Sequence, residues 1–433
     1  MLQKSPRLKR TQVIAVVFLT VAGIVNYLDR TTLSIANHTV SQELHLSGAQ
    51  IGLLLSAFSL AYAFAQLPVG ALLDRFGSRV MLGLGMFVWS VAQIAGGFIQ
   101  TLNHFLIARI VLGVAEAPLF PAGAKVVNEW FAVRERGGPT GTFIASSTIA
   151  PMLAPPLLTV LMISFGWRTM FIIMGVLGVM VSLGWYVVYR NRDDVALTQA
   201  ETAYLDEGAK VEQRPEGLSF AEWRTLFTLR NTWGMIFGFM GVIYMVWLYL
   251  TWLPGYLENE RHLSIAHTGW LVSIPYIFGT LGMAGSGYIA DYLLKRGMAP
   301  IRSRKWPVCV GLIGAAAFTV PAAYTPSTAM AITYVCLAMF FVNLASGSAW
   351  ALVSVAAPRH LVASLGSMQN FGGYLGGSFA PVITGIVVDQ THSFVDALLI
   401  SAGVAFAAAF VYLFVVQDTA PSLPPNVAKA QSI

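Results

Sequence analysis

The sequence predicts an all-α integral membrane protein with twelve transmembrane helices in two pseudo-symmetric halves of six. The first observation is composition: of 433 residues, 56% are hydrophobic and only 11% are charged, which is too apolar for a soluble domain. The second is a succession of apolar stretches that are each long enough to cross a bilayer, for which a helix needs about 20 residues. The third is a motif that occurs once in each half of the chain.

The expected spans follow in chain order: residues 14–36, 50–73, 79–98, 103–125, 139–163, 168–189, 231–252, 268–292, 306–325, 329–352, 362–386 and 394–417. We expect the fifth span to be interrupted by its three prolines, Pro151, Pro155 and Pro156. One long polar segment separates the sixth span from the seventh. The expected domains are therefore an N-terminal half at 1–190, a cytoplasmic linker at 191–230 and a C-terminal half at 231–433.

The formal net charge of +6 is compatible with a nucleic-acid partner, but the positions of the cations argue against one. If the N-terminus is cytoplasmic, Arg168 and Arg261 are the only basic residues that fall on the outer side. Short cytoplasmic loops of membrane proteins carry an excess of Lys and Arg. The basic charge therefore predicts that both termini are cytoplasmic, and no nucleic-acid partner is expected.

The repeated motif lies in two turns of the predicted helical halves. One copy runs from Gly70 through Asp74 to Arg79, and the other runs from Gly287 through Asp291. The two copies are 217 residues apart, about half the chain. Internal repeats of this kind are typical of secondary transporters, which bind substrate near the bilayer midplane at the repeat interface.

Four charges fall inside predicted spans: Asp29 and Arg30 in the first, and Arg109 and Glu116 in the fourth. Each costs roughly 2.5–3.5 kcal/mol to insert, so intramembrane charges usually line an ion or substrate path. Arg109 and Glu116 are seven residues apart and share a helix face. We therefore expect the two helices to adjoin, with the charges around a wet cavity. The alternative is that permanent ion pairs only fix the packing of the helices.

The types of these charged residues suggest a chemistry. The planar guanidinium of arginine donates two parallel hydrogen bonds to a carboxylate. A carboxyl group can carry a proton, because burial disfavours its charged form and a nearby cation favours it. Import of one anionic charge against an inside-negative potential costs about 2.3 kcal/mol per 100 mV, which one co-transported proton cancels. The pattern therefore predicts an anion–proton symporter.

The turn at 70–79 resembles the loop between helices two and three of the major facilitator superfamily. That pattern is Gly-x-x-x-Asp-Arg/Lys-x-Gly-x-Arg/Lys-Arg/Lys, and Val80 replaces its last basic residue here. The resemblance implies the major facilitator fold and a charge-linked conformational latch at Gly70, Asp74, Arg75, Gly77 and Arg79, with Asp291 in the second copy. Simple solvation of a loop is the alternative for these residues.

Longer runs are similar to the anion:cation symporter family, and most of all to its bacterial sugar-acid branch for galactonate, glucarate or galactarate and hexuronates. They are Asn-Tyr-Leu-Asp-Arg at 26–30 and the runs at 58–68, 108–121 and 247–254. The resemblance covers nearly the whole chain. It implies a proton-coupled importer of a small organic carboxylate in the bacterial inner membrane, with the small organic anion, protons and the lipid bilayer as its partners.

Site residues are carried over by position. Asp29 and Glu116 match the proton-coupling acids of the family. The expected substrate-binding residues are Tyr27, Arg30, Tyr62, Arg109, Trp350 and Asn370, with Ser147 and Gln369 as further candidates. Ordinary packing is the alternative for the two tyrosines and the tryptophan, and an interhelical hydrogen bond is the alternative for Asn370.

Three positions depart from the galactonate type. Ser147 and Phe239 stand where glutamines are expected, and Gly347 stands where a serine is expected. Each change removes or shrinks a group that would hydrogen-bond a sugar hydroxyl, and a site built for hydroxyls discriminates through them. An aromatic carboxylate is therefore a rival substrate. Uncoupled facilitation or anion exchange on the same fold is a rival mechanism.

Other classes of protein fit the sequence poorly. We find no His/Cys metal spacing, no phosphate-binding glycine loop and no nucleophile motif, so an enzyme is not expected, and neither is a metal or cofactor. A channel would lack the paired latch motifs, and a receptor on a transporter fold would bind ligand without moving it. The protein is expected to function as a monomer.

Overall fold

The computed structural model describes residues 5–132, 135–207, 226–356 and 362–418, and these residues contain helices and turns but no strand. The predicted all-α fold is confirmed. The chain divides into two compact units, one formed by residues 1–212 with 263–273 and the other by the remainder. Each unit is described by itself.

The first unit contains seven α-helices among the described residues: α1 (Pro6–Leu44), α2 (Gly48–Gly96), α3 (Leu102–Glu116), α4 (Leu119–Trp130), α5 (Gly137–Val188), α6 (Gln199–Leu205) and α9 (Ile265–Leu271). The second unit contains α8 (Arg230–Gly255), α10 (Ser273–Lys295), α11 (Pro300–Tyr324), α12 (Thr328–Ala356), α13 (Val362–Thr391) and α14 (Val395–Phe414). A π-helical turn at Tyr256–Glu260 extends α8.

Ten helical segments of the described chain are long and apolar enough to cross a membrane. One of them, α5, has 52 residues and changes direction at Gly166, so it provides two spans. The 23-residue helix α10 coincides with the expected eighth span. With the two parts of α5 counted separately and α10 added, the described helices overlap each of the twelve predicted spans, although α10 is not among the ten that are apolar enough to cross a membrane.

Two glycines turn the long helices of the first unit. Gly77 in α2 has φ 75° and Gly166 in α5 has φ 81°, and this region of backbone conformation favours glycine. Each glycine marks the point where one predicted span ends and the next begins. The prediction that Pro151, Pro155 and Pro156 interrupt the fifth span is wrong, because α5 keeps helical backbone angles through all three.

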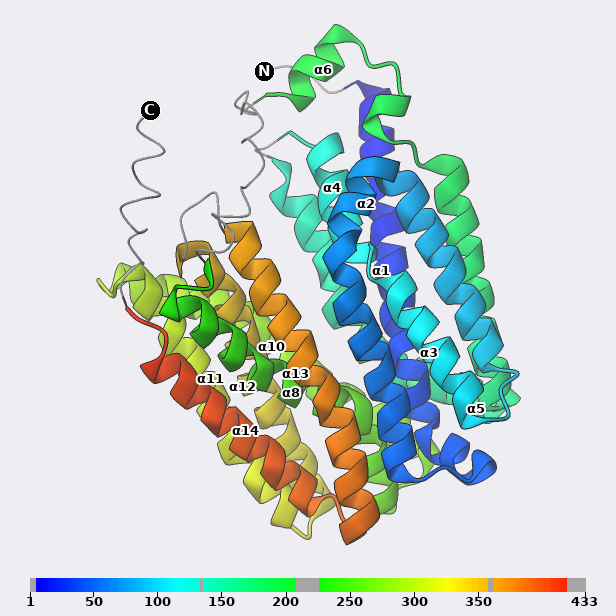
Figure 1. The fold of residues 1–433 in the computed structure, drawn as a ribbon, viewed down its shortest axis with the longest axis vertical. Coiled ribbons are helices and arrows are strands. Elements are labelled where there is room, and N and C mark those ends of the chain that lie inside the picture. The colour runs from blue at the N-terminus through cyan, green and yellow to red at the C-terminus, as the bar shows by residue number, and fades with distance from the viewer. Residues whose placement is uncertain (1–4, 133–134, 208–225, 357–361, 419–433) are drawn as a thin grey trace. The chain divides into compact units, whose positions relative to one another are not determined.

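Within the first unit, α1 packs against α5, and α2 packs against both α3 and α5 (Figure 1). Small residues bring α2 and α3 together. A Cβ atom added at Gly113 of α3 would lie only 2.4 Å from the carbonyl oxygen of Phe58 on α2. Only glycine permits this approach of two backbones. The contact fixes how far α2 and α3 are shifted along their axes relative to one another.

Helix α6 lies within the expected linker. Helix α6 begins with a capping box, in which the side chains of Thr198 and Glu201 each accept a hydrogen bond from the backbone N–H of the other residue. Ser5, ahead of α1, donates a hydrogen bond to Glu201, and Tyr204 donates one to Glu135. The hydrogen bond from Ser5, with those from Thr198, holds the pKa of Glu201 below its usual range. Helix α6 is therefore fixed to the start of α1 and to the segment before α5.

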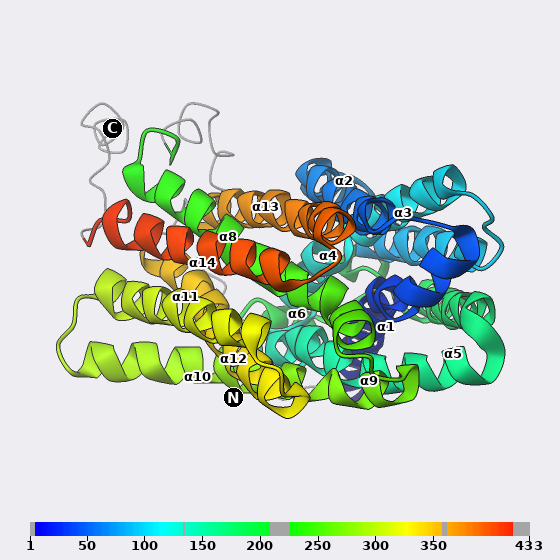
Figure 2. The same cartoon turned by 90° about the horizontal axis from the view of Figure 1, so that it is seen from below.

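In the second unit, α14 lies between α11 and α8, and α8 packs in turn against α13 (Figure 2). The contact between α10 and α12 is close at one glycine. A Cβ atom added at Gly282 would lie 2.0 Å from the carbonyl oxygen of Phe340. As in the first unit, small residues let helices approach where lipid provides no hydrophobic drive for association.

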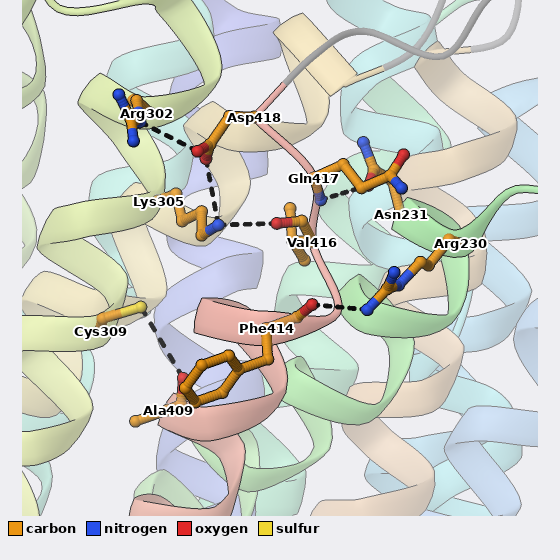
Figure 3. A network of polar contacts seen from close by, with 10 residues as sticks. All are labelled: Arg230, Asn231, Arg302, Lys305, Cys309, Ala409, Phe414, Val416, Gln417 and Asp418. Carbon is orange, nitrogen blue, oxygen red and sulfur yellow. Dashed lines mark hydrogen bonds and ion pairs between the residues drawn. The ribbon is translucent and has the colours of Figure 1, made fainter.

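A polar network closes the end of α14 (Figure 3). The buried Lys305 of α11 donates hydrogen bonds to the carbonyl oxygen of Val416 at 2.7 Å and to Asp418 at 3.0 Å. Arg302 also donates to Asp418, at 2.9 Å, and Arg230 of α8 donates to the carbonyl oxygen of Phe414 at 2.7 Å. Cations near the C-terminus of a helix donate hydrogen bonds to its free carbonyl groups and interact favourably with its dipole. The network thus joins α8, α11 and α14 at one end.

Candidate functional site

The four predicted intramembrane charges come together in the first unit. Asp29 and Arg30 lie on α1 and Arg109 and Glu116 lie on α3, and each of these side chains belongs to a residue that is at most 4% exposed. Arg109 interacts electrostatically with all three of the others, and Glu116 also acts on Asp29. We call these four residues the charged cluster.

Arg30 and Glu116 form a direct ion pair within the charged cluster. Nε of Arg30 donates to Oε2 of Glu116 across 2.7 Å, and both side chains are almost fully buried. The pair joins the middle of α1 to the last residue of α3, so these helices adjoin, as the charge pattern predicted. Removal of two charges from water is costly, and it is tolerated where the geometry of the pair is good.

Aromatic rings surround the guanidinium of Arg30. Its Cζ atom lies 5.0 Å from the ring centroid of Tyr27, 5.1 Å from that of Phe58 and 4.7 Å from that of Tyr62. These distances are within the roughly 6 Å over which a cation is attracted to the face of an aromatic ring. The two tyrosines predicted from the sequence therefore lie beside the charged cluster, together with a phenylalanine that was not predicted.

Two members of the charged cluster lack hydrogen-bond partners. Both carboxyl oxygens of Asp29, and Nε and Nη1 of Arg109, are buried and make no hydrogen bond within the described part of the chain. Buried polar groups are nearly always paired, so unpaired ones mark strain, a catalytic role or an absent partner such as water or an ion. Unpaired charges at membrane depth are expensive and usually functional.

This arrangement has two chemical capacities. Arg109 presents free nitrogen donors in the planar geometry that matches a carboxylate. Asp29 and Glu116 are buried carboxyl groups, for which burial favours the protonated form and the nearby arginines favour the charged form. The cluster can therefore bind an organic anion and can hold or release a proton beside it. Among the described residues, no group of His, Cys, Asp and Glu side chains is placed to hold a metal ion.

The second-half candidates lie on neighbouring helices of the second unit. Trp350 on α12 is 44% exposed and packs edge-to-face on Phe239 of α8, with ring centroids 5.8 Å apart. Gln369 on α13 is fully buried and donates from Nε2 to the carbonyl oxygen of Ala349 at 3.4 Å. Its Oε1 accepts no hydrogen bond in the described residues, whereas the next residue, Asn370, is half-buried.

Packing explains the glycine at one of the three unusual positions. A Cβ atom added at Gly347 would lie 2.2 Å from Oγ of Ser286 and 2.8 Å from Sδ of Met283, both on α10. A serine therefore fits at position 347 only if the side chains of Ser286 and Met283 move. The hydroxyl of Ser286 instead occupies this space, and it donates to the carbonyl oxygen of Met283 at 2.7 Å.

The other two unusual residues are also held by local contacts. Phe239 is fully buried, and a Cβ atom added at Gly373 of α13 would lie 2.6 Å from its ring. Ser147 is half-buried on α5 and donates to the carbonyl oxygen of Ile144 at 2.8 Å, on its own helix. Its hydroxyl is therefore engaged locally by the backbone.

The first copy of the latch motif is tied to neighbouring helices. Asp74 forms an ion pair with Lys125 of α4, with 3.0 Å between Oδ1 and Nζ, although the Asp74 side chain is 84% exposed. The guanidinium of Arg79 donates to the carbonyl oxygen of Tyr186 at 2.9 and 3.0 Å. The backbone N–H of Arg79 donates to Oδ1 of Asn191 at 2.9 Å. An exposed ion pair contributes little by itself, and Arg79 adds three hydrogen bonds at this turn.

The remaining latch residues are more exposed. Gly70 and Arg75 lie on the surface of α2, and the Arg75 guanidinium is 5.3 Å from the ring of its neighbour Phe76. Gly77 has little space, since an added Cβ atom would lie 2.6 Å from Nδ2 of Asn191. In the second copy Asp291 is exposed near the end of α10, and Gly297 after it has φ 87°.

Sequence reasoning missed three residues that the structure places in these sites. Phe58 lies against both arginines of the charged cluster. Lys125 is the partner of Asp74, and Asn191 holds the turn at Gly77. A signal existed only for Phe58, which is four residues before Tyr62 and so on the same helix face. Lys125 and Asn191 are far from the motif in sequence, and only the fold brings them to it.

The fold and the charged cluster together define a polytopic membrane transporter. The chain belongs to the Major Facilitator Superfamily, whose family model matches residues 19–381. This membership and the names of the relatives identify a transporter and not an enzyme.

Three relatives cover nearly the whole chain. A probable L-galactonate transporter of Escherichia coli strain K12 is 49% identical over 96% of this chain and 92% of its own length. A probable galactarate/D-glucarate transporter, GarP, of the same strain is 33% identical over 94% and 95%. The hexuronate transporter of Bacillus subtilis strain 168 is 31% identical over 92% and 94%. These relatives all carry names of sugar-acid transporters.

Solved structures agree on the fold. A bacterial homologue of the human lysosomal transporter Spinster superimposes with a TM-score of 0.80 at 16% identity, covering 96% of this chain and 98% of the other. A D-xylose–proton symporter superimposes with a TM-score of 0.72 at 14% identity, covering 95% and 100%. At these identities the likeness concerns the fold alone.

Proposed function

We propose that the protein is a proton-coupled symporter that imports a sugar acid, namely a hexonate, aldarate or hexuronate. The observation that carries the proposal is the pairing pattern of the charged cluster. Arg109 has buried, unpaired donors beside an unpaired Asp29, in a chain 49% identical to a probable L-galactonate transporter. The names of the other two relatives extend the substrate class to aldarates and hexuronates.

Arg109 is proposed to bind the substrate carboxylate through its buried guanidinium, with Arg30, Tyr27 and Tyr62 beside it. The hydroxyl groups of a sugar acid need additional donors and acceptors. Candidates for these contacts are the indole of Trp350, the side-chain amides of Gln369 and Asn370, and the hydroxyl of Ser147. A site that hydrogen-bonds several hydroxyls rejects analogues without them, because its own polar groups would be left unpaired.

Asp29 and Glu116 are proposed to couple protons to this anion. When the carboxylate of the substrate reaches the arginines, it competes with the protein's own acids for their positive charge. The acids then lose cationic neighbours, and their protonated forms become favoured. With one proton per monoanion, transport is electrically neutral. A second proton would carry one net positive charge inward, and the membrane potential would drive it with about 2.3 kcal/mol per 100 mV.

Alternating access is proposed to occur by movement of residues 1–190 relative to residues 231–433. The latch residues Asp74, Arg75 and Arg79, and Asp291 in the second half, would hold helix ends in one state and release them in the other. The positions of the basic loops favour cytoplasmic termini in a bacterial inner membrane. We expect each monomer to contain a complete path.

One alternative substrate class has a specific observation in its favour. Phe239 and Gly347 present no hydroxyl or amide side chain, and Phe239 lies edge-to-face on Trp350. Phe239 is itself fully buried, so the partly exposed Trp350 would supply the aromatic surface that suits an aromatic carboxylate. An uncoupled facilitator or anion exchanger would use Arg109 in the same way but would not need Asp29 to change protonation.

A thermal-shift screen of the purified protein tests the proposal. A ligand that binds the folded state raises the melting temperature by mass action. We expect stabilisation by L-galactonate, galactarate or a hexuronate in the wild type and none in Arg109→Ala. The matched control is Arg168→Ala, which removes an arginine that pairs with Glu43 outside the charged cluster. Stabilisation by aromatic acids only would overturn the sugar-acid assignment.

A further inference from the structure

Phe58 occupies an unusual position between the two arginines of the charged cluster. Its ring centroid is 5.1 Å from Cζ of Arg30 and 5.0 Å from Cζ of Arg109. The residue is fully buried. One buried aromatic ring therefore lies within cation–π distance of both guanidinium groups.

Two cations held this close repel one another, and each has lost its hydration. Glu116 offsets part of the positive charge through its ion pair with Arg30. The face of an aromatic ring carries partial negative charge and attracts a desolvated cation, and this attraction is stronger when the cation is buried. The ring of Phe58 can compensate both arginines without forming a hydrogen bond that an anion would have to break.

The ring is itself fixed in place. The carbonyl oxygen of Phe58 lies against Gly113, where an added Cβ atom would come within 2.4 Å. Gly113 is one helical turn after Arg109 on α3. This close approach therefore sets the position of Arg109 along the helix axis relative to the ring. On its own helix, Phe58 stacks on Tyr62 with a centroid distance of 6.1 Å and an interplanar angle of 25°.

We propose that Phe58 is a positioning residue of the anion site. Its ring holds the guanidinium groups of Arg30 and Arg109 in place through cation–π attraction, so that a carboxylate can engage Arg109 near Arg30. The role depends on the electron density of the ring and not only on its volume. This inference rests on the proposed function for the identity of the anion, but the arrangement of the arginines exists without ligand.

The test replaces Phe58 with phenylalanines that carry one, two or three ring fluorines. Fluorine withdraws electron density from the ring face and changes its shape little. We expect the melting temperature of the ligand-free protein to fall stepwise along the series. We also expect the dissociation constant for L-galactonate to rise stepwise, by about tenfold for the trifluorinated ring. The same series at Phe171 is the control, because that buried ring packs on Phe105 and Trp167.

The two readouts separate the inference from the proposed function. A melting temperature that does not change along the Phe58 series, or falls equally along the Phe171 series, overturns the inference. A falling melting temperature with unchanged affinity overturns the positioning role, since the ring would then only stabilise the fold. If the wild type binds no sugar acid, the proposed substrate is wrong. The melting series still decides whether Phe58 holds the arginines.

Discussion

Arg30 and Glu116 face one another where α1 meets α3, with 2.7 Å between Nε and Oε2. Their immediate neighbours differ: Asp29 on the same helix and Arg109 on the same α3 face have polar atoms without hydrogen-bond partners in the described chain. The charged cluster therefore consists of one hydrogen-bonded pair, Arg30 with Glu116, and two residues, Asp29 and Arg109, whose side chains form no hydrogen bond in the described chain. Such an asymmetric arrangement is suited to an incoming anion, because the vacant donors are available without breaking the existing ion pair.

Replacement of Arg109 tests the vacant donors. Arg109→Lys keeps the charge but loses the planar arrangement of nitrogens, and Lys and Arg are not interchangeable at a carboxylate site. We expect the affinity for the transported sugar acid to fall by about ten- to a hundredfold, the value of a charge-assisted hydrogen bond. Isothermal titration of purified protein measures it. Affinity within twofold of the wild type would exclude Arg109 as the carboxylate anchor.

Replacement of Glu116 tests the ion pair. Glu116→Gln leaves Arg30 buried with its charge uncompensated, and breaking a buried pair in this way costs about 3–5 kcal/mol. We expect a clear fall in the melting temperature of Glu116→Gln in detergent. The double variant Arg30→Met with Glu116→Gln should recover part of it, because no lone charge remains. A loss in the double variant equal to the sum of the losses in Arg30→Met and Glu116→Gln alone would show that the two residues are not coupled.

The network at the end of α14 predicts a pH-dependent contribution to stability. Partial burial alone would raise the pKa of Asp418, but hydrogen bonding and charge from Lys305 and Arg302 outweigh it and hold the pKa below its usual range. A depressed pKa stabilises the folded state at higher pH, and this contribution is lost as pH falls through the folded pKa. It should therefore be complete at neutral pH, begin to fall near pH 4, the ordinary pKa of an aspartate, and be lost as pH falls through the lower folded pKa.

The variant Asp418→Asn isolates this contribution. The Asp418 side chain is 38% exposed, so solvent screening limits the difference from wild type to about 1 kcal/mol at pH 7. Melting curves between pH 3 and 7 should show the two proteins converging at the acid end. A difference that is constant across this range would mean that the Asp418 charge does not contribute.

The packing around Gly347 predicts that a larger residue at this position clashes with side chains of α10. Gly347→Ser places a Cβ atom against Oγ of Ser286, so we expect a destabilisation of about 1–3 kcal/mol from overpacking. The double variant Gly347→Ser with Ser286→Gly should relieve it and return a hydroxyl to the same region from α12. Melting temperatures of the single and double variants measure the effect. Equal melting temperatures for the two variants would contradict the contact with Ser286.

Much of the fold follows from local signals in the sequence. The apolar runs predicted the spans, and the glycines at 77 and 166 lie at turns between them. The prolines of α5 were misleading because helical backbone angles persist through all three of them. Neighbouring helices can satisfy the backbone groups that a proline frees in a membrane helix, so proline alone does not predict where a span is interrupted.

The charged cluster was also predictable in part. Helical spacing placed Arg109 and Glu116 on one face, and the cost of buried charge predicted that α1 and α3 meet there. The sequence did not reveal which acid pairs with which base. That choice depends on how α1 lies against α3, because Arg30 and Glu116 are 86 positions apart and only the fold brings them together.

Uptake into proteoliposomes under an imposed pH gradient tests the central claim most directly. We predict that the wild type concentrates radiolabelled L-galactonate when the outside is acidic, and that a protonophore abolishes this accumulation. Asp29→Asn should lose the accumulation but keep exchange of labelled for unlabelled substrate, while the exposed control Asp396→Asn behaves as the wild type. Accumulation by Asp29→Asn that still follows the pH gradient would contradict proton coupling through the charged cluster.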